Sequence, residues 1–110
     1  MADFLGEFEQ LVLFAVLRLG AGAYGVTVRD EIETRTGRMI SAGAVYTALE
    51  RLETRGFVAS WFGEPTPARG GRRKRHFRVE PAGQRALQRS YNGLQRMARG
   101  VRIKLEVPSR

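Results

Sequence analysis

Six of the twelve residues at positions 69–80, RGGRRKRHFRVE, are Arg or Lys. Guanidinium and ammonium groups bind phosphates through charge-assisted hydrogen bonds, so the chemistry that this stretch offers is the binding of a polyanion. Gly70 and Gly71 would let the backbone turn and approach such a partner closely. A solvated charge run or a localisation signal has a similar composition. The elements that flank the stretch must therefore decide its role.

The sequence lacks the residue types that catalysis and metal binding most often need. It has no cysteine, and its only histidine is His76. A lone histidine in an alternating run is more often a partly buried or hydrogen-bonded strand residue than a catalyst or a metal ligand. The glycine pair in GGRRKR lacks the G-x-x-x-x-G-K-[ST] pattern of a nucleotide-binding loop. We therefore expect no enzyme, no metal site and no cofactor.

Charge is distributed unequally along the 110 residues. Residues 1–64 carry six Lys or Arg and nine Asp or Glu. Residues 65–110 carry thirteen Lys or Arg but only two Asp or Glu, and the net charge of the whole chain is +8. Because the charges of residues 65–110 are nearly all positive, this part of the chain should attract nucleic acid, an acidic protein or anionic lipid. The length fits one domain, and no apolar run is long enough to span a membrane. Acidic residues near the N-terminus do not fit a secretory signal, so we expect a soluble cytoplasmic protein.

The first expected helix covers residues 4–19. Its apolar residues follow helical spacing and fill most of its circumference, which predicts burial on more than one side. In a chain of this size, the second buried side favours contact between subunits, and we expect Leu11 and Phe14 to lie there. Gly20 and Gly22 should end the helix.

Two shorter helices should follow the first. An amphipathic segment over 24–36 predicts the second, with Gly37 as its C-cap. Ser41 suits the N-cap of a third helix, 41–55. The apolar inner stripe of that third helix holds Val45, Ala48, Leu49 and Leu52.

Outer positions of the third helix are candidates for contact with the polyanion. Its N-terminal turn has small side chains, so another surface could approach its backbone closely. The candidates are Ser41, Gly43, Tyr46, Thr47 and Arg51. Ser41 could serve only as the N-cap, and Tyr46 could pack against the neighbouring helices. Arg51 could instead pair with Glu50 or Glu53.

A β-hairpin should contain the basic stretch. Two β-prone runs, 57–64 and 72–80, are separated by Pro and Gly residues at 65–71. In the second run, alternation places Phe77 and Val79 on the buried face, and it prevents the basic residues from all pointing the same way. The basic candidates for phosphate or minor-groove contact are Arg69, Arg72, Arg73, Lys74 and Arg75.

A long helix should end the chain. Pro81 suits a first helical turn, and apolar residues spaced 4, 3, 4, 3 and 4 apart predict a heptad stripe along a helix over 82–106. Such a helix would project beyond a small domain unless a second copy of the chain covered it. Gly93 and Gly100 would share a face of this helix. The candidate dimer contacts are Leu87, Tyr91, Leu94, Ala98, Val101 and Leu105.

Three helices, a hairpin and a long helix are the element order of a winged helix-turn-helix. We therefore predict a mainly α (α+β) fold, with a winged helix-turn-helix DNA-binding domain over 1–80 and a C-terminal dimerisation helix over 81–110. In this architecture the third helix enters the DNA major groove, and the hairpin, or wing, meets the backbone or the minor groove. The basic stretch would then be the tip and shoulder of the wing.

The order of these motifs resembles that of the PadR-like transcriptional regulators, in the short form with a single C-terminal helix. The stretches that carry the resemblance are AYGV at 23–26, SAGAVYTALERL at 41–52 and GGRRKRHFRV at 70–79. The resemblance covers about residues 5–90. It implies a bacterial dimeric regulator that binds double-stranded operator DNA, and most regulators of this family are repressors. It also implies that Tyr46 lies on the recognition helix, and that a small, flat hydrophobic effector could bind near the dimer interface.

Another class of function is binding of RNA or an acidic protein through the basic half. RNA-binding modules usually present exposed aromatic side chains on a sheet for base stacking. The aromatic residues near the hairpin fall within apolar runs and fit a core better. The sequence therefore favours a homodimeric regulator, associated with the nucleoid, that binds an inverted-repeat operator.

Overall fold

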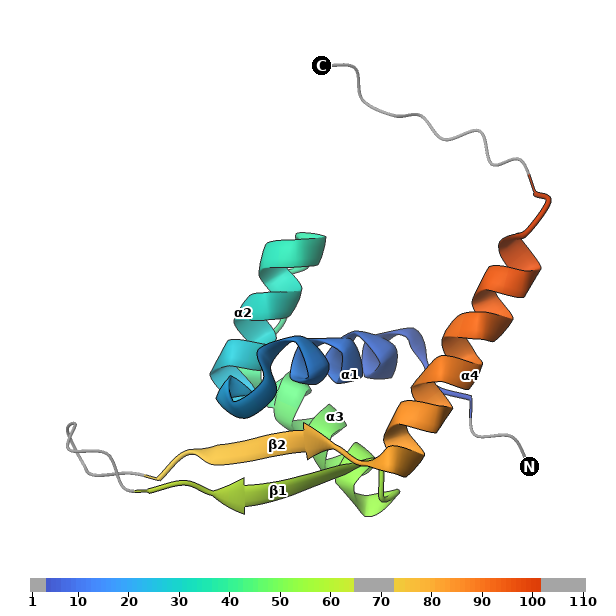
Figure 1. The fold of residues 1–110 in the computed structure, drawn as a ribbon. Coiled ribbons are helices and arrows are strands. Elements are labelled where there is room, and N and C mark those ends of the chain that lie inside the picture. The colour runs from blue at the N-terminus through green and yellow to red at the C-terminus, as the bar shows by residue number, and fades with distance from the viewer. Residues whose placement is uncertain (1–3, 65–72, 102–110) are drawn as a thin grey trace.

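The computed structural model describes residues 4–64 and 73–101. Its elements follow the predicted order, three helices, a two-stranded hairpin and a final helix, so the mainly helical winged helix-turn-helix fold is confirmed (Figure 1). In chain order the elements are α1 (Glu7–Leu19), the 3-10 helix η1 (Gly20–Gly22), α2 (Gly25–Thr36), α3 (Ala42–Thr54), β1 (Val58–Phe62), β2 (Arg75–Val79) and α4 (Pro81–Ala98).

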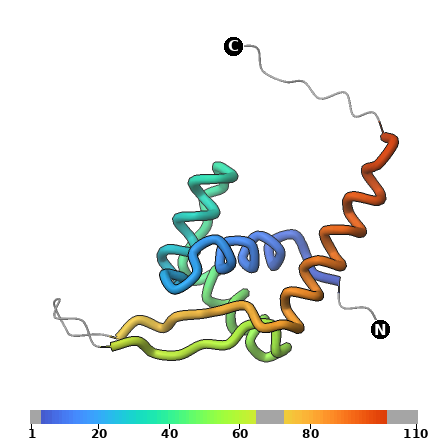
Figure 2. The backbone as a smooth tube through the Cα atoms, viewed as in Figure 1, coloured from blue at the N-terminus to red at the C-terminus, as the bar shows by residue number. Residues whose placement is uncertain are grey.

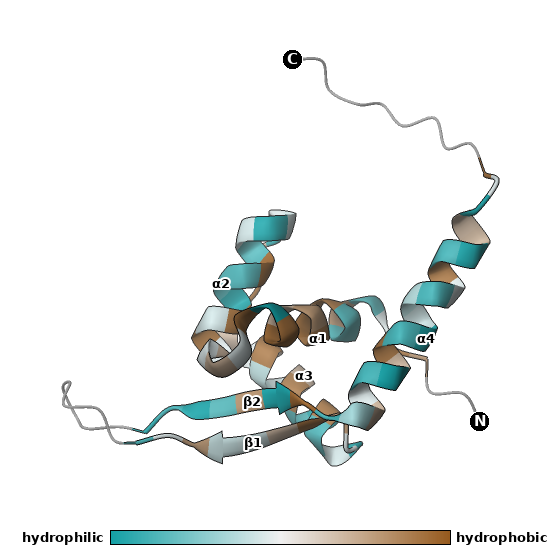
Figure 3. Cartoon of the chain, in the orientation of Figure 1, coloured by the Kyte–Doolittle hydropathy of each residue, from teal (hydrophilic) through white to brown (hydrophobic). Residues whose placement is uncertain are grey.

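Helix α1 lies at the centre of the domain, where it contacts the three other helices and β2. Its side chains Val12 and Val16 are buried, and the predicted inner stripe of α3, including Leu49 and Leu52, is buried too. Phe77 of β2 closes this core from the side of the hairpin. Burial of each such side chain stabilises the fold by about 1.5–3 kcal/mol. The apolar segments gather around α1 in Figure 3.

Local signals set the ends of the first three helices as predicted. Gly20 and Gly37 adopt positive φ angles of 57° and 75° after α1 and α2, a conformation that a side chain would disfavour. Ser41 caps α3, because its Oγ accepts a hydrogen bond from the backbone N–H of Ala44 at 3.0 Å. The helix-turn-helix of α2 and α3 is thus bounded by caps at the turn.

An ion-pair cluster on the surface links α2 to α1. The carboxylate of Glu31 accepts hydrogen bonds from Arg35 on its own helix at 2.6 Å and from Arg18 of α1 at 3.1 Å. The hydrogen bond from Arg35, followed by that from Arg18, holds the pKa of the Glu31 carboxyl below its usual value. The carboxylate therefore stays charged and bridges the two helices.

The hairpin strands pair antiparallel, with Val58 opposite Val79 and Phe62 opposite Arg75. Because successive side chains point to opposite faces, Arg75 and Phe77 share the face that looks toward α3, and His76 lies on the outer face. The alternation predicted for this strand is therefore confirmed. This alternation determines which basic side chains of β2 face α3.

A third segment, which the sequence did not reveal, pairs with β2 through an isolated bridge. Tyr24 forms an isolated antiparallel bridge with His76, and the N–H of Phe77 donates to the carbonyl of Ala23 at 2.9 Å. The Nδ1 of His76 also lies 3.1 Å from the carbonyl oxygen of Ala21. His76 is therefore a hydrogen-bonded strand residue, as expected. These contacts join the middle of β2 to the connection between α1 and α2.

The last helix is shorter than predicted. Instead of running to residue 106, α4 ends at Ala98, and Gly100 follows with a φ of 81°. Glycine adopts this left-handed conformation without a steric penalty, so it stops the helix. Val101 is therefore exposed beyond the helix rather than on its stripe, and Gly93 and Gly100 do not share a helix face. Leu105 lies outside the described residues.

Helix α4 begins against the domain and then leaves it (Figures 1 and 2). Leu87 in its first half is buried, and the ring of Tyr91 meets that of Phe14 of α1 edge to face at 5.8 Å. Beyond this point Leu94 and Met97 are strongly exposed. The second half of α4 thus presents apolar side chains that the described part of the chain does not cover.

Candidate nucleic-acid interface

One stripe of α3 faces away from the core. Gly43, Thr47, Glu50 and Thr54 are all exposed, and their spacing of 4, 3 and 4 residues places them along one side of the helix. Arg51, also exposed, flanks this stripe on the side of α1, where it lines a groove with Thr47 and Glu9. The structure therefore brings the sequence candidates Gly43, Thr47 and Arg51 together on one surface.

Tyr46 lies beside this stripe and packs against two other elements. Its ring meets that of Phe77 in β2 with the centroids 6.4 Å apart, and 36% of the residue is exposed. A Cβ atom added at Gly25, the first residue of α2, would lie 2.4 Å from Cε2 of Tyr46 and 2.7 Å from its hydroxyl oxygen. The packing role considered for Tyr46 is thus present, and the exposed part of the side chain faces solvent next to the stripe.

We expect the substitution Gly25→Ala to displace Tyr46. The added methyl group would overlap the ring, and overpacking of this kind destabilises a domain by about 1–3 kcal/mol. Chemical denaturation should show this loss. Gly22→Ala is the matched control, because no heavy atom lies within 4 Å of a Cβ there. Equal unfolding midpoints for the two variants would contradict the close contact of Tyr46 with α2.

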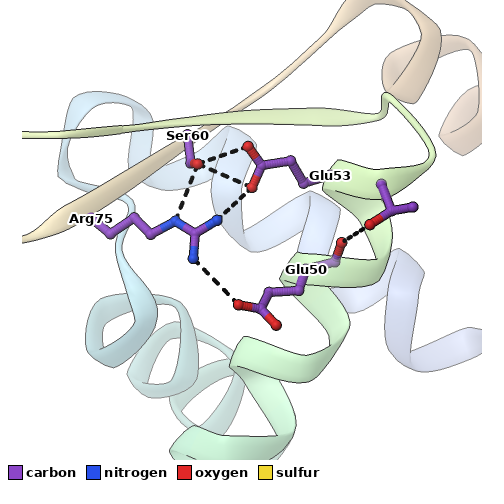
Figure 4. Close-up of polar contacts among 5 residues, drawn as sticks. Glu50, Glu53, Ser60 and Arg75 are labelled. Atoms are coloured by element: carbon purple, nitrogen blue, oxygen red, sulfur yellow. Dashed lines mark hydrogen bonds and ion pairs between the residues drawn. The ribbon is translucent and has the colours of Figure 1, made fainter.

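Arg75 joins the wing to α3 (Figure 4). Its Nη2 donates to Glu53 at 2.7 Å, its Nε to Ser60 of β1 at 3.1 Å, and its Nη1 to Glu50 at 3.4 Å. The hydroxyl of Ser60 in turn donates to the carboxylate of Glu53. The guanidinium also lies 5.1 Å from the ring centroid of Phe77. One half-buried side chain thus contacts α3 and both strands.

The sequence did not reveal this network. Arg75 was expected to contact phosphate, and Arg51 to compete for Glu50 or Glu53. In the structure, the carboxylates of Glu50 and Glu53 both form ion pairs with Arg75. Within the described residues, Arg51 forms no ion pair. Glu50 and Glu53, three apart on α3, face a strand more than twenty residues away along the chain. That pairing depends on the hairpin register, which no local pattern supplied.

The other basic candidates lie farther along the wing. Arg73 and Lys74 are exposed, and the Nζ of Lys74 lies 4.6 Å from the ring centroid of Tyr24 and 3.3 Å from its hydroxyl. Lys74 therefore has a packing contact besides its charge. Arg69 and Arg72 lie outside the described residues.

Two aromatic residues of β1 are more exposed than the sequence predicted. Phe62 is 61% exposed and Trp61 is 39% exposed, although both were expected to favour a core position. Trp61 stacks on His76 with the ring centroids 5.5 Å apart, and Arg78 lies 5.7 Å from the Trp61 ring. That prediction was wrong because Trp61 shares the outer face of the hairpin with its partner His76, and Phe62 lies at the last paired position before the loop.

A comparison with protein families identifies the family of this chain. The model of the transcriptional regulator PadR-like family matches residues 13–89, from within α1 into α4. This chain belongs to the PadR-like family. It is therefore a DNA-binding transcriptional regulator and not an enzyme, in agreement with the residue types in its sequence.

Solved structures share the fold of this PadR-like protein. A transcriptional regulator from Clostridium thermocellum is 23% identical, with a TM-score of 0.67 and coverage of 81% of each chain. A PadR family regulator from Clostridium difficile R20291 is 20% identical, with a TM-score of 0.66 and coverage of 84% of this chain and 95% of that one. A third, from Eggerthella lenta, is 24% identical, with a TM-score of 0.65 and coverage of 86% and 81%. No curated protein sequence matches the chain.

The described residues contain neither a membrane-spanning helix nor a metal-binding cluster. Across 4–64 and 73–101, no helix has the length and apolar character needed to cross a membrane. Over the same ranges, no three His, Cys, Asp or Glu side chains are grouped so that they could hold a metal ion.

Proposed function

We propose that this PadR-like protein is a homodimeric, sequence-specific repressor that places α3 in the DNA major groove and its wing on the backbone or minor groove. The observation that carries this proposal is the Arg75 network, which holds β2 beside the exposed stripe of α3. With the two elements fixed together, the stripe and the basic stretch that leads into β2 would meet one duplex at the same time.

The proposed DNA contacts divide by chemistry. Exposed positions near the start of α3 would meet base edges and nearby phosphates, whereas the wing would neutralise the backbone. The residues proposed to contact DNA are Ser41, Gly43, Tyr46, Thr47, Arg51, Arg69, Arg72, Arg73 and Lys74. We assign Arg75 a positioning role instead, because its three guanidinium nitrogens are directed at Glu50, Glu53 and Ser60.

Competition binding tests this function against its alternative. The exposed Trp61 and Phe62 are side chains on which unpaired bases could stack, so RNA is the second candidate ligand. Fluorescence anisotropy should measure affinity for the promoter-side DNA of the chain's own gene and for a structured RNA of equal length, at matched salt. We expect tighter binding to an inverted repeat with half-sites about one helical turn apart. Preference for RNA, or equal binding to all duplexes, would refute the proposal.

The dimer would form through the uncovered apolar face of α4 and the adjoining part of α1. Leu94 and Met97 of α4, with Phe14 and Leu17 of α1, are exposed on a chain of only 110 residues. An apolar surface of this kind on a small domain typically marks a contact with another chain. A second copy would also set the spacing of two recognition helices, as an inverted repeat requires.

We expect Leu94→Lys to shift the protein from dimer to monomer. The substitution would place a charge at the centre of the proposed contact, where burial without a partner is strongly unfavourable. Sedimentation velocity over a range of concentrations should reveal the change. Gln88→Lys is the control, since Gln88 lies on a different side of α4, in a groove with Val79 and Gln84. A dimer that survives Leu94→Lys would exclude this face.

An effector site near the dimer contact is the remaining element of the proposal. The described cavity beside Phe14 and Ile32 has a volume of about 60 Å³, smaller than the several hundred Å³ of ordinary ligand pockets. A flat hydrophobic effector would thus need surface from both subunits. Its binding would shift the spacing of the recognition helices through α4, provided that it binds one spacing more tightly than the other.

A further inference from the structure

Glu50 is the acidic residue on the exposed stripe of α3. Its side chain is 64% exposed, whereas the neighbouring acid, Glu53, is turned toward the hairpin and is about half as exposed. Gly43, Thr47 and Thr54 share its side of the helix. If α3 enters the major groove, Glu50 enters with it.

A carboxylate in this position opposes DNA binding in general. Phosphates line the groove on both sides, so the negative charge of Glu50 is repelled whatever the base sequence. Nη1 of Arg75 lies 3.4 Å from Oε2 of Glu50. This ion pair offsets the charge of Glu50 in part and also orients its carboxylate. A residue that weakens binding to all DNA improves selectivity if one base sequence forms a favourable contact with that residue and so restores the lost affinity.

The second oxygen of Glu50 is available for such compensation. Within the described residues, Arg75 bonds only Oε2, and no partner contacts Oε1. A carboxylate oxygen can accept a hydrogen bond but cannot donate one. In the major groove, cytosine presents the N4 amino donor, whereas guanine presents two acceptors, O6 and N7, that would repel the carboxylate. Adenine also presents an amino donor, N6, but its acceptor N7 lies beside that donor and would repel the carboxylate.

We propose that Glu50 is a specificity-determining residue that requires cytosine at one position of each operator half-site. Arg75 holds its carboxylate in place, and the free oxygen accepts a hydrogen bond from cytosine N4. Guanine at the same position is the least tolerated base. This inference depends on the proposed function, because it requires α3 in the major groove.

Selection of binding sites from a random duplex library tests the inference, with wild-type protein and the variants Glu50→Ala and Glu50→Gln. We expect wild-type sites to show one cytosine position per half-site, where guanine lowers affinity roughly 5- to 150-fold. Glu50→Ala should lose this preference, retain the others and bind random DNA more tightly. Glu50→Gln should lose most of the discrimination against guanine, because an amide can also donate.

The control is Asp30→Asn, which removes the same charge from an exposed, arginine-paired carboxylate on α2. It should bind random DNA more tightly, as the Glu50 variants do, but keep every base preference. Unchanged preferences in Glu50→Ala, with its thermal unfolding also unchanged, would overturn the inference. Failure of the wild-type protein to select any sequence would instead overturn the proposed function, so the two failures are distinguishable.

Discussion

Replacement of Arg69, Arg72 and Arg73 by Ala is expected to weaken DNA binding about 100-fold or more and to reduce its dependence on salt. Each arginine that contacts a phosphate releases condensed counterions, and each contact contributes about 0.9 to the slope of log affinity against log salt. Loss of three contacts should therefore make the slope shallower by about 2.7. Titrations by anisotropy between about 50 and 200 mM salt measure both effects.

A control of equal charge separates position from net charge. Arg85, Arg89 and Arg96 are exposed on α4, away from its apolar stripe, and their replacement by Ala lowers the net charge by the same amount. We expect this variant to keep most of the affinity and nearly the full salt slope. Equal losses in the two triple variants would mean that the basic half attracts DNA without a defined role for the wing.

The elements were predictable where the signal is local. Ser41 caps α3, Gly37 ends α2 and Pro81 opens α4, and each acts through its own backbone conformation or an adjacent hydrogen bond. The buried stripe of α3 followed from helical spacing alone. The winged helix-turn-helix could therefore be derived from the order of the elements.

The parts that could not be predicted depend on contacts between distant segments. The partners of Arg75 lie 15 to 25 residues away, and Tyr46 meets both Gly25 and Phe77. An exposed strand position such as Phe62 also looks like a core position in the sequence, because hydrophobicity does not reveal that it is the last paired position before the loop. Of the candidate site, the sequence identified the surfaces but not the coupling between them.

Gly83→Ala is expected to destabilise the domain by about 2–3 kcal/mol, although glycine-to-alanine changes inside helices usually stabilise. Gly83 lies buried in the first turn of α4, where its backbone approaches the segment between α3 and β1. A Cβ there would lie 2.1 Å from the carbonyl oxygen of Phe57 and 2.9 Å from its carbonyl carbon. That oxygen also accepts a hydrogen bond from the N–H of Glu80 at 2.8 Å, so the backbone cannot move aside without losing it.

The same substitution at Gly93 supplies the comparison on the same helix. A Cβ at Gly93 would meet Cε1 of Phe4 at 3.8 Å, an ordinary contact, so helix propensity should dominate and raise stability by about 0.5–1 kcal/mol. Urea denaturation at one fixed protomer concentration should place the two variants on opposite sides of the wild-type midpoint. Because α4 carries the proposed dimer contact, Gly83→Ala should also weaken the dimer, whereas Gly93→Ala should leave it intact. If both variants were stabilised, α4 could not dock on Phe57 as closely as the structure places it, and the link from the DNA-binding domain to the dimer would have to run through α1 alone.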